Sequence, residues 1–144
     1  MRYQKLARWA LLLLGLVVVL GCSGEEQRIE VTGTVTFDGQ PIDNGTVLFI
    51  PEGDSGSQTR PKFGTQIVNG KYAFEPNFGP VPGKYKVTIA WHKKTGRKIS
   101  TGDLVDTDET EQVLPPKYNS EKETVLQVTV SRRENKHDFA LTSN

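Results

Sequence analysis

The sequence predicts an all-β protein, a seven-stranded antiparallel Greek-key β-sandwich. Several segments alternate apolar and polar residues, and turn signals rich in glycine, proline and asparagine separate them at short intervals. No segment after the leader shows an apolar period of 3.6 residues long enough for a helix. About 120 residues follow the leader, which suffices for one domain with a single core.

The first two strands are predicted on either side of a turn. Apolar residues occupy alternate positions between Ile29 and Phe37, which places one set of side chains on a core face. Gly33 interrupts this set and indicates a bulge or a closely approaching neighbour. Asp38-Gly39 then turns the chain. Residues 46–50 form an apolar run and are expected to be a central strand covered on both sides.

The middle of the chain predicts a hairpin and a longer strand. Residues 63–68 and 71–74 flank Asn69-Gly70, a strong hairpin signal because both residues tolerate the positive φ of a type I′ turn. Residues 76–83 contain three prolines and predict a rigid connector. Residues 84–91 alternate again and place four apolar side chains on one face.

The last two strands are expected to pair with each other. They span residues 124–130 and 137–141, and the charged turn 131–135 joins them. With this pair, seven short strands follow one another with frequent turns, a pattern typical of an antiparallel sandwich.

The amino-terminal segment has the layout of an export signal. Basic residues precede an unbroken apolar run over residues 10–20, and Gly21 then precedes Cys22. The run is shorter than the ~20 residues that a membrane-spanning helix needs. This layout resembles a bacterial lipoprotein signal, and the resemblance implies that residues 1–21 are removed and Cys22 is lipidated on its sulfur and new amine. An ordinary signal peptide or an uncleaved anchor, with Cys22 incidental, is the alternative.

A lipid anchor would place the mature protein at a membrane face of the cell envelope. Residues 22–27 are expected to be the lipidated cysteine and a polar tether, and residues 28–144 the domain. Cys22 is the one cysteine, so no intrachain disulfide forms. Ser23 stands where some families place an inner-membrane retention aspartate, which favours an outer-membrane or periplasm-facing location.

The charge of the mature chain argues against a nucleic-acid partner. Removal of residues 1–21 takes away three basic residues and leaves 15 Lys and Arg against 17 Asp and Glu. A net charge of −2 provides no general attraction for phosphate backbones.

A family resemblance becomes visible in the motif spacing. Residues 31–42 read VTGTVTFDGQPI, residues 45–49 read GTVLF, and the segments GKYAF at 70–74 and VPGKYKVTI at 81–89 follow. Together they resemble the carboxypeptidase regulatory-like, or transthyretin-like (prealbumin-type), β-sandwich domain over roughly residues 28–141. With the leader and the late segment LPPKY at 114–118, the chain is similar to small lipoproteins of planctomycete-type bacteria. The resemblance implies a fold and says little about chemistry.

The region 91–118 contains the candidate binding residues. It is longer than a plain hairpin loop and has a basic half followed by an acidic half. The simpler interpretation is a solvated loop whose halves attract each other, and the sharper one is a ligand-binding loop at one end of the sandwich. Its candidate residues are Trp91, His92, Asp103, Asp106 and Asp108.

None of the specific ligand classes has a complete pattern in this region. Asp106 and Asp108 alternate as calcium ligands can, but the region has no full cation loop. His92 and His137 would need a third ligand to bind zinc. Trp91 could stack on a sugar ring, although it continues a core-facing series. We therefore predict no metal site and no cofactor.

The function predicted is a non-catalytic, lipid-anchored envelope module, structural or in contact with envelope proteins or glycans. No serine lies in a nucleophile-elbow pattern, and Cys22 is expected to carry lipid. The chain also lacks the carboxy-terminal signature of the hydrolases that share the transthyretin-like fold. The alternative is a small-ligand or metal-binding site in the 91–118 region, possibly hydrolytic.

Overall fold

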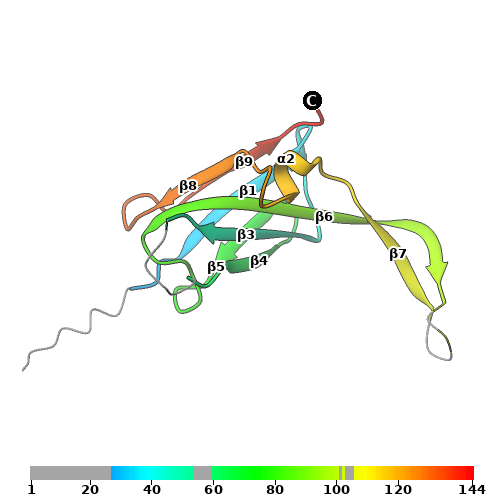
Figure 1. Cartoon of the computed structure of the whole chain (residues 1–144), viewed down its shortest axis with the longest axis horizontal. Helices are drawn as coiled ribbons and strands as arrows, with labels where there is room; N and C mark the ends of the chain where they lie inside the picture. The colour runs from blue at the N-terminus through cyan, green and yellow to red at the C-terminus, as the bar shows by residue number, and fades with distance from the viewer. Residues whose placement is uncertain (1–26, 54–59, 101, 103–105) are drawn as a thin grey trace, which may run out of the picture.

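The computed structural model describes residues 27–53, 60–100, 102 and 106–144 (Figure 1). These residues form two β-sheets and a single short helix, so the all-β prediction is confirmed. The elements are β1 (Val31–Phe37), β2 (Gln40–Pro41), β3 (Gly45–Pro51), β4 (Phe63–Ile67), β5 (Lys71–Phe74), β6 (Gly83–Ile99), β7 (Thr107–Gln112), α2 (Pro116–Asn119), β8 (Leu126–Val130) and β9 (Phe139–Leu141). The leader, Cys22 and most of the predicted tether lie outside the described residues.

The first sheet is built around β1. Its first half pairs antiparallel with β5, with Val31 opposite Phe74. Its second half pairs antiparallel with β2 and parallel with β9, where Val35 is opposite Phe139. Every other strand in this sheet therefore reaches the sheet through β1.

The second sheet is built around β6 and is antiparallel throughout. β3 pairs with residues 85–91 of β6, and β8 pairs with residues 83–87. Because both partners share residues 85–87, they lie on opposite edges of β6. β4 extends the sheet beyond β3, and β7 pairs with residues 92–99, past the end of β3.

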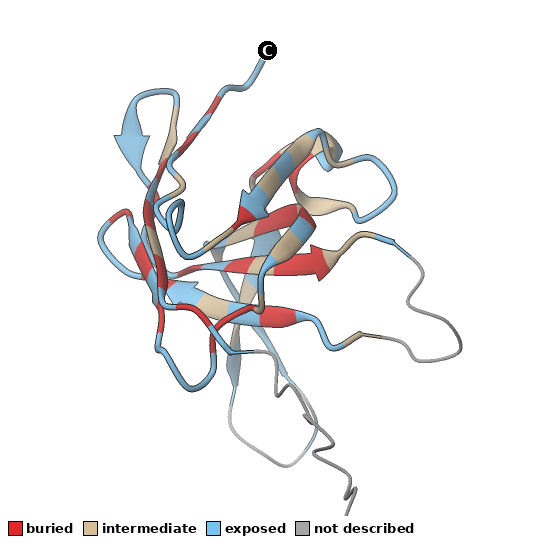
Figure 2. Ribbon diagram, turned by 90° about the vertical axis from the view of Figure 1, so that its left-hand side faces the viewer, coloured by how far each residue is buried: buried red, intermediate tan, exposed pale blue. Residues whose placement is uncertain are grey.

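Buried residues gather between the two sheets (Figure 2). This core is rich in aromatic rings. Phe49 of β3 is fully buried, and its ring centroid is 5.1 Å from Phe74, 5.8 Å from Tyr85 and 6.3 Å from Tyr72. Rings from both sheets thus meet at one residue, in the tilted and edge-on arrangements that aromatic pairs prefer. The predicted core face of residues 84–91 is confirmed, because Tyr85, Val87 and Ile89 are buried, although Thr88 on the other face is buried as well.

Both predicted turns adopt the expected backbone. Asp38 and Gly39 have φ values of 49° and 79°, and Asn69 and Gly70 have 50° and 73°. Two consecutive positive φ values are the mark of a type I′ turn, whose twist matches the flanking strands.

Gly33 has the close neighbour that the sequence predicted. A Cβ at this position would lie 1.8 Å from the His137 carbonyl oxygen and 2.7 Å from the Tyr72 ring. The same carbonyl accepts a 2.7 Å hydrogen bond from the Tyr72 hydroxyl. The backbone of residues 136–137 therefore lies directly against β1 because residue 33 has no side chain.

The structure differs from the sequence prediction in four places. The described residues form nine strands rather than the seven predicted, because β2 and β7 are added. The segments 124–130 and 137–141 do not pair with each other: β8 joins the β6 sheet and β9 joins β1 in parallel, so the turn 131–135 crosses between the sheets. β3 is central, but Thr46 is exposed, so only one face is fully covered. Residues 91–118 are not a long loop, because β6 continues to Ile99.

His137 sits at the edge of the core with an unsatisfied ring atom. Its Nε2 is buried and has no hydrogen-bond partner among the described residues. Burial lowers the pKa of this imidazole, although Glu134 and Asp138 act in the opposite direction. The side chain is therefore held in its neutral form, as burial of a titratable cation requires.

We predict that Gly33→Ala destabilises the fold by more than about 2 kcal/mol, because the added methyl group overlaps backbone that cannot move independently. Chemical denaturation would measure the loss. Gly64→Ala is the matched strand control, since its Cβ would lie 3.3 Å from the end of the Leu48 side chain and 3.7 Å from the Val47 carbonyl oxygen, without overlap. A Gly33→Ala variant as stable as Gly64→Ala would contradict the packing described for β1.

We predict that the free energy of unfolding falls between pH 7 and pH 5. The folded-state pKa of His137 lies below its unfolded value of 6.5, so the unfolded chain binds the extra proton at a higher pH than the folded chain does. Protonation therefore stabilises the unfolded state relative to the folded state as the pH falls. Urea denaturation at several pH values would measure this slope. The slope should become shallower in His137→Gln and remain in His92→Gln, because His92 is exposed.

Candidate functional site

The predicted 91–118 loop is a two-stranded arm that extends from the sandwich (Figure 1). The arm consists of residues 92–99 of β6 and all of β7. His92 pairs with Gln112 and Ile99 pairs with Thr107, with a register shift between Lys94 and Lys98. Gly96, at φ 83°, lies within this shift, where a bulge needs the freedom of glycine.

Ion pairs join the basic strand of the arm to the acidic one. The two carboxylate oxygens of Asp108 accept from Lys94 Nζ at 2.5 Å and Lys98 Nζ at 2.6 Å. Glu109 Oε2 accepts from Arg97 Nε and Thr95 Oγ1, each at 2.6 Å. The predicted attraction between the two halves is therefore confirmed, in the form of a strand ladder with cross-strand pairs.

The lysine pair changes the titration of Asp108. Hydrogen bonds from Lys94 and then Lys98 favour the carboxylate and lower its pKa from 3.8 to about 2. The same contact raises the pKa of Lys94. Asp108 thus remains charged at any physiological pH and serves as the bridge between two cations.

Trp91 fastens the base of the arm to the sandwich. Its Nε1 donates a 2.8 Å hydrogen bond to the Asp43 carbonyl, and its ring meets Phe37 edge-on at 6.1 Å. Lys93 Nζ lies 4.1 Å from the ring centroid, within the range of a cation–π contact. The ring is half-buried, so little of it is left for a sugar to stack on.

The arm does not bring its candidate residues into one site. Trp91 and His92 are consecutive on β6, so their side chains point to opposite faces. His92 pairs with Gln112, and Asp108 lies four positions from Gln112 on β7, which is about 13 Å at roughly 3.3 Å per residue. Asp106 is exposed, and Asp103 lies outside the described residues. Across the described ranges, no three His, Cys, Asp or Glu side chains gather as metal ligands would.

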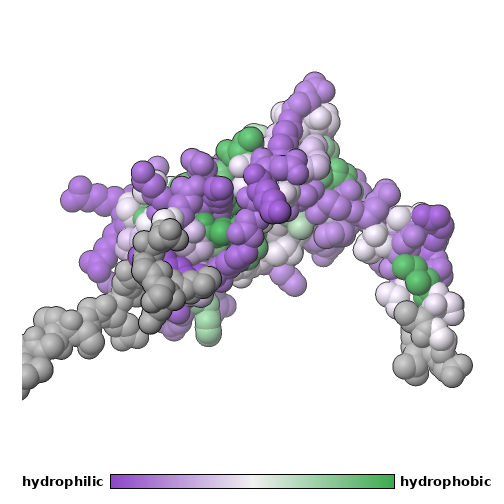
Figure 3. Space-filling model, in the orientation of Figure 1, coloured by the Kyte–Doolittle hydropathy of each residue, from purple (hydrophilic) through white to green (hydrophobic). Residues whose placement is uncertain are grey.

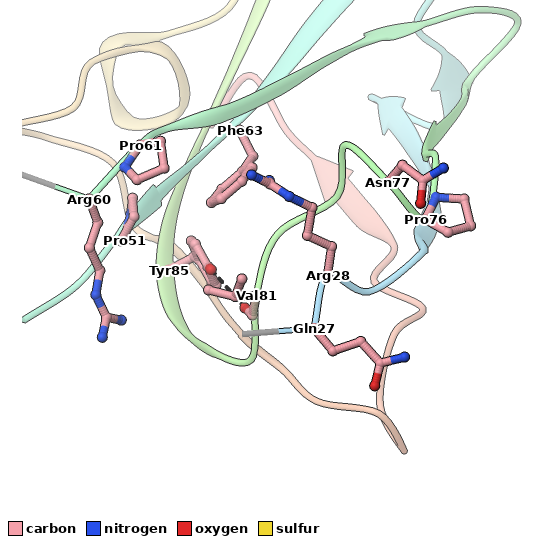
Figure 4. A pocket seen from close by; sticks show the side chains of 10 residues that line it. All are labelled: Gln27, Arg28, Pro51, Arg60, Pro61, Phe63, Pro76, Asn77, Val81 and Tyr85. Atoms are coloured by element: carbon pink, nitrogen blue, oxygen red, sulfur yellow. Dashed lines mark hydrogen bonds between the residues drawn. The ribbon is translucent and has the colours of Figure 1, made fainter. Parts of the chain in front are cut away.

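A cleft of about 780 Å³ lies at the opposite end of β6 (Figure 4). We call it the amino-terminal cleft, because the first described residues form part of its wall. Its lining residues are Gln27, Arg28, Pro51, Arg60, Pro61, Phe63, Pro76, Asn77, Val81 and Tyr85. Prolines and rings form the apolar part, and two arginines and two amides supply polar groups.

The polar groups of this cleft are partly committed to the fold. Arg28 lies over the Phe63 ring at 5.5 Å and donates through Nη1 to the Gly79 carbonyl at 3.2 Å. The Tyr85 hydroxyl donates to the Val81 carbonyl at 2.7 Å. Arg60 lies on the other side and extends away from Arg28 (Figure 4). The described lining includes no carboxylate, imidazole, thiol or aliphatic hydroxyl, so it suits anionic or apolar groups better than acid–base chemistry.

Sequence reasoning did not identify this cleft. Its lining comes from four separate segments, and the distances between them depend on sheet pairing. The available signals in the sequence were the three prolines in 76–83 and two arginines that each follow a polar stretch, Arg28 and Arg60. Neither signal indicates a cavity without the fold.

Comparison with known proteins adds little. No family model and no curated protein matches the chain. Among solved structures, a 9R-lipoxygenase from Cyanothece PCC8801 aligns over 87% of the chain with 14% identity and a TM-score of 0.35. The chain spans 18% of the length of that enzyme, and a likeness of this degree transfers neither fold nor activity.

Within the described ranges, no helix has the length and apolar character needed to cross a membrane.

We predict that the Asp108 carboxyl titrates with a midpoint near pH 2. Carbon-13 NMR of the carboxyl resonance would measure this midpoint. Replacing both lysines, Lys94→Ala with Lys98→Ala, should raise the midpoint toward 3.8, because the charge-stabilising donors are gone. Asp138 is an internal control, since Thr34, outside the arm, is the main cause of its lowered pKa. If the Asp108 midpoint is the same with and without the two lysines, the arm is not paired as described.

Proposed function

We propose that the protein is a non-catalytic, lipid-anchored module of the cell envelope, held through Cys22 and presenting the arm to an envelope protein. The observation that carries this proposal is the layout along β6. The described chain begins beside the amino-terminal end of β6, and the arm occupies the other end (Figure 1).

The length of β6 supports a presenting role. Its 17 residues correspond to a contour of about 55 Å at roughly 3.3 Å per residue. An anchor near residue 27 would hold one end of this strand at a membrane and let the other end reach outward. The acyl chains expected on Cys22 would make such attachment nearly permanent, since each buried methylene contributes about 0.8 kcal/mol.

The arm has features of a contact element rather than of a ligand pocket. Its strands have no sheet neighbour beyond each other within the described residues, so their outer backbone groups are open to pairing. Its described surface is mostly hydrophilic (Figure 3), and Ile99 is an exposed apolar side chain there, 47% exposed. A two-stranded ribbon is marginal alone, and a partner strand would stabilise it by β-augmentation.

The alternative, a metal-dependent or hydrolytic site in the 91–118 region, receives less support. Asp108 and Glu109 already pair with Lys94, Arg97 and Lys98. A metal ion would have to displace these cations, and His92 is far from both carboxylates along the ladder. Glycan binding at Trp91 meets a similar obstacle in Lys93.

We propose, as the finer description of the fold, that the two sheets form a Greek-key sandwich of the prealbumin type. In support, the chain passes between the sheets at β2–β3, β4–β5, β5–β6 and β8–β9. A superposition of an experimental structure on prealbumin-type domains would test this description.

We expect mass spectrometry of the native protein to find Cys22 at the amino terminus, with a diacylglyceryl thioether and an acylated amine. Cys22→Ser should move the protein from the membrane fraction to the soluble fraction, because the acyl chains are lost. Crosslinking in intact envelopes should capture a partner with wild type and lose it when Ile99→Lys and Thr110→Pro alter the arm. Unmodified Cys22 on a soluble protein, or crosslinking that does not depend on the arm, would contradict the proposal.

A further inference from the structure

The start of the described chain is fixed to one end of the sandwich. The Ile29 amide donates to the Pro80 carbonyl at 2.9 Å, and Arg28 donates to the Gly79 carbonyl. A Cβ on Gly79 would lie 2.0 Å from the Ile29 carbonyl oxygen, so the two backbones are in direct contact. The connector 75–82 therefore determines where the chain leaves the domain.

This exit point lies close to Cys22 in sequence. Gln27 lies five positions after Cys22, and five positions span at most about 18 Å when the chain is fully extended. If Cys22 carries lipid, the end of the sandwich that contains the exit point cannot be farther than this from the headgroup layer. The sequence thus limits which surface can face the bilayer.

That end of the sandwich exposes an aromatic side chain on a rigid loop. Phe78 is 73% exposed, more than the other exposed large apolar residues of the described chain. Its amide donates to the Glu75 carbonyl at 2.9 Å, and Pro76 and Pro80 lie on either side. The backbone that carries the ring is thus held in place, so binding through the ring requires little further ordering.

Basic side chains surround the same end. The registers place the loops before β4, before β6 and after β8 there, since Pro51 pairs with Tyr85 and Gly83 pairs with Val130. Five basic residues of these loops and strand ends form no ion pair among the described residues: Arg28, Arg60, Lys84, Arg132 and Arg133. Among the described residues, four carboxylates share this end, Glu30, Glu52, Glu75 and Glu134, so the excess of positive charge there is small. Attraction to phosphate then depends on where the arginines lie, and Arg28 and Arg60 line the cleft beside the exit point.

We infer that this end, with Phe78, Arg28 and Arg60, docks on the lipid headgroup layer of the membrane. This inference rests on the proposed anchor at Cys22. Phe78 enters the interface between headgroups and acyl chains, and the two guanidinium groups contact lipid phosphates. Docking gives the domain a second contact with the membrane in addition to the tether. The domain is then held in one orientation, with β6 directed away from the bilayer.

The experiment uses the lipidated protein in vesicles of phosphatidylethanolamine and phosphatidylglycerol. Phe78→Cys and Ile99→Cys are each labelled with a nitroxide, and the accessibility of the label to oxygen and to a water-soluble nickel chelate is measured by electron paramagnetic resonance. Ile99 is the matched control, an exposed apolar residue at the far end of β6. We expect the oxygen-to-nickel ratio at position 78 to rise roughly threefold from detergent to vesicles, and to stay constant at position 99.

The outcomes separate docking from anchoring. Flotation of the wild-type protein with vesicles reports whether the lipid anchor is present. An acylated Cys22 has no free thiol, so the nitroxide reacts only with the introduced cysteine. Flotation combined with a water-accessible label at position 78 would overturn docking and leave the anchor in place. Failure to float would overturn both.

Arg60 is tested in the same assay. Arg60→Gln should reduce the ratio at position 78 in the anionic vesicles and leave thermal unfolding unchanged, because the Arg60 side chain is not part of the core. An unchanged ratio would remove the phosphate contact of Arg60 from the inference.

Discussion

The continuity of β6 is the constraint on which the rest of the structure depends. One face of its first half buries Tyr85, Val87 and Ile89 between the sheets. Its edges receive β3 and β8 there, and its second half receives β7. β7 joins the second sheet through this strand, and the chain after β7 returns to the core at Leu114, which is buried. Trp91 marks the change between the two parts, with its ring on the core edge and its backbone amide bonded to the Gln112 side chain.

Different forces stabilise the two parts of β6. The sandwich half is stabilised mainly by burial of apolar area. The arm has little apolar area and relies on a ladder reinforced by exposed ion pairs. Such pairs contribute little individually and are screened by salt. The arm is therefore the part whose conformation a binding partner can alter with least cost to the core.

The sequence was sufficient for seven of the strands and for their turns, but not for the sheet pairing. Alternation, the apolar run over residues 46–50 and turn signals located these strands, and Asn69-Gly70 and Asp38-Gly39 predicted their turns, because these signals are local. β7 was missed since the segment Thr107–Gln112 is entirely polar and has no buried face to impose a period. The parallel pairing of β9 with β1 depends on contacts across a hundred residues, and only Gly33 gave a hint of it. For the candidate site, the sequence predicted that the charged halves attract, but the resulting pairs use the carboxylates that a ligand would need.

The position of the cleft relative to the arm links the two proposals physically. A tether alone would let the domain tumble over the membrane, and the arm would then sample every height up to its full reach. A second contact at the amino-terminal end removes most of this freedom, because two attachment points fix the direction of a rigid body. The rigidity needed for this is present, since the connector 75–82 is bonded to the first described residues and β6 runs uninterrupted from there to the arm. An envelope partner at a fixed distance from the bilayer would then meet the arm at a higher effective concentration than a freely tumbling domain could provide.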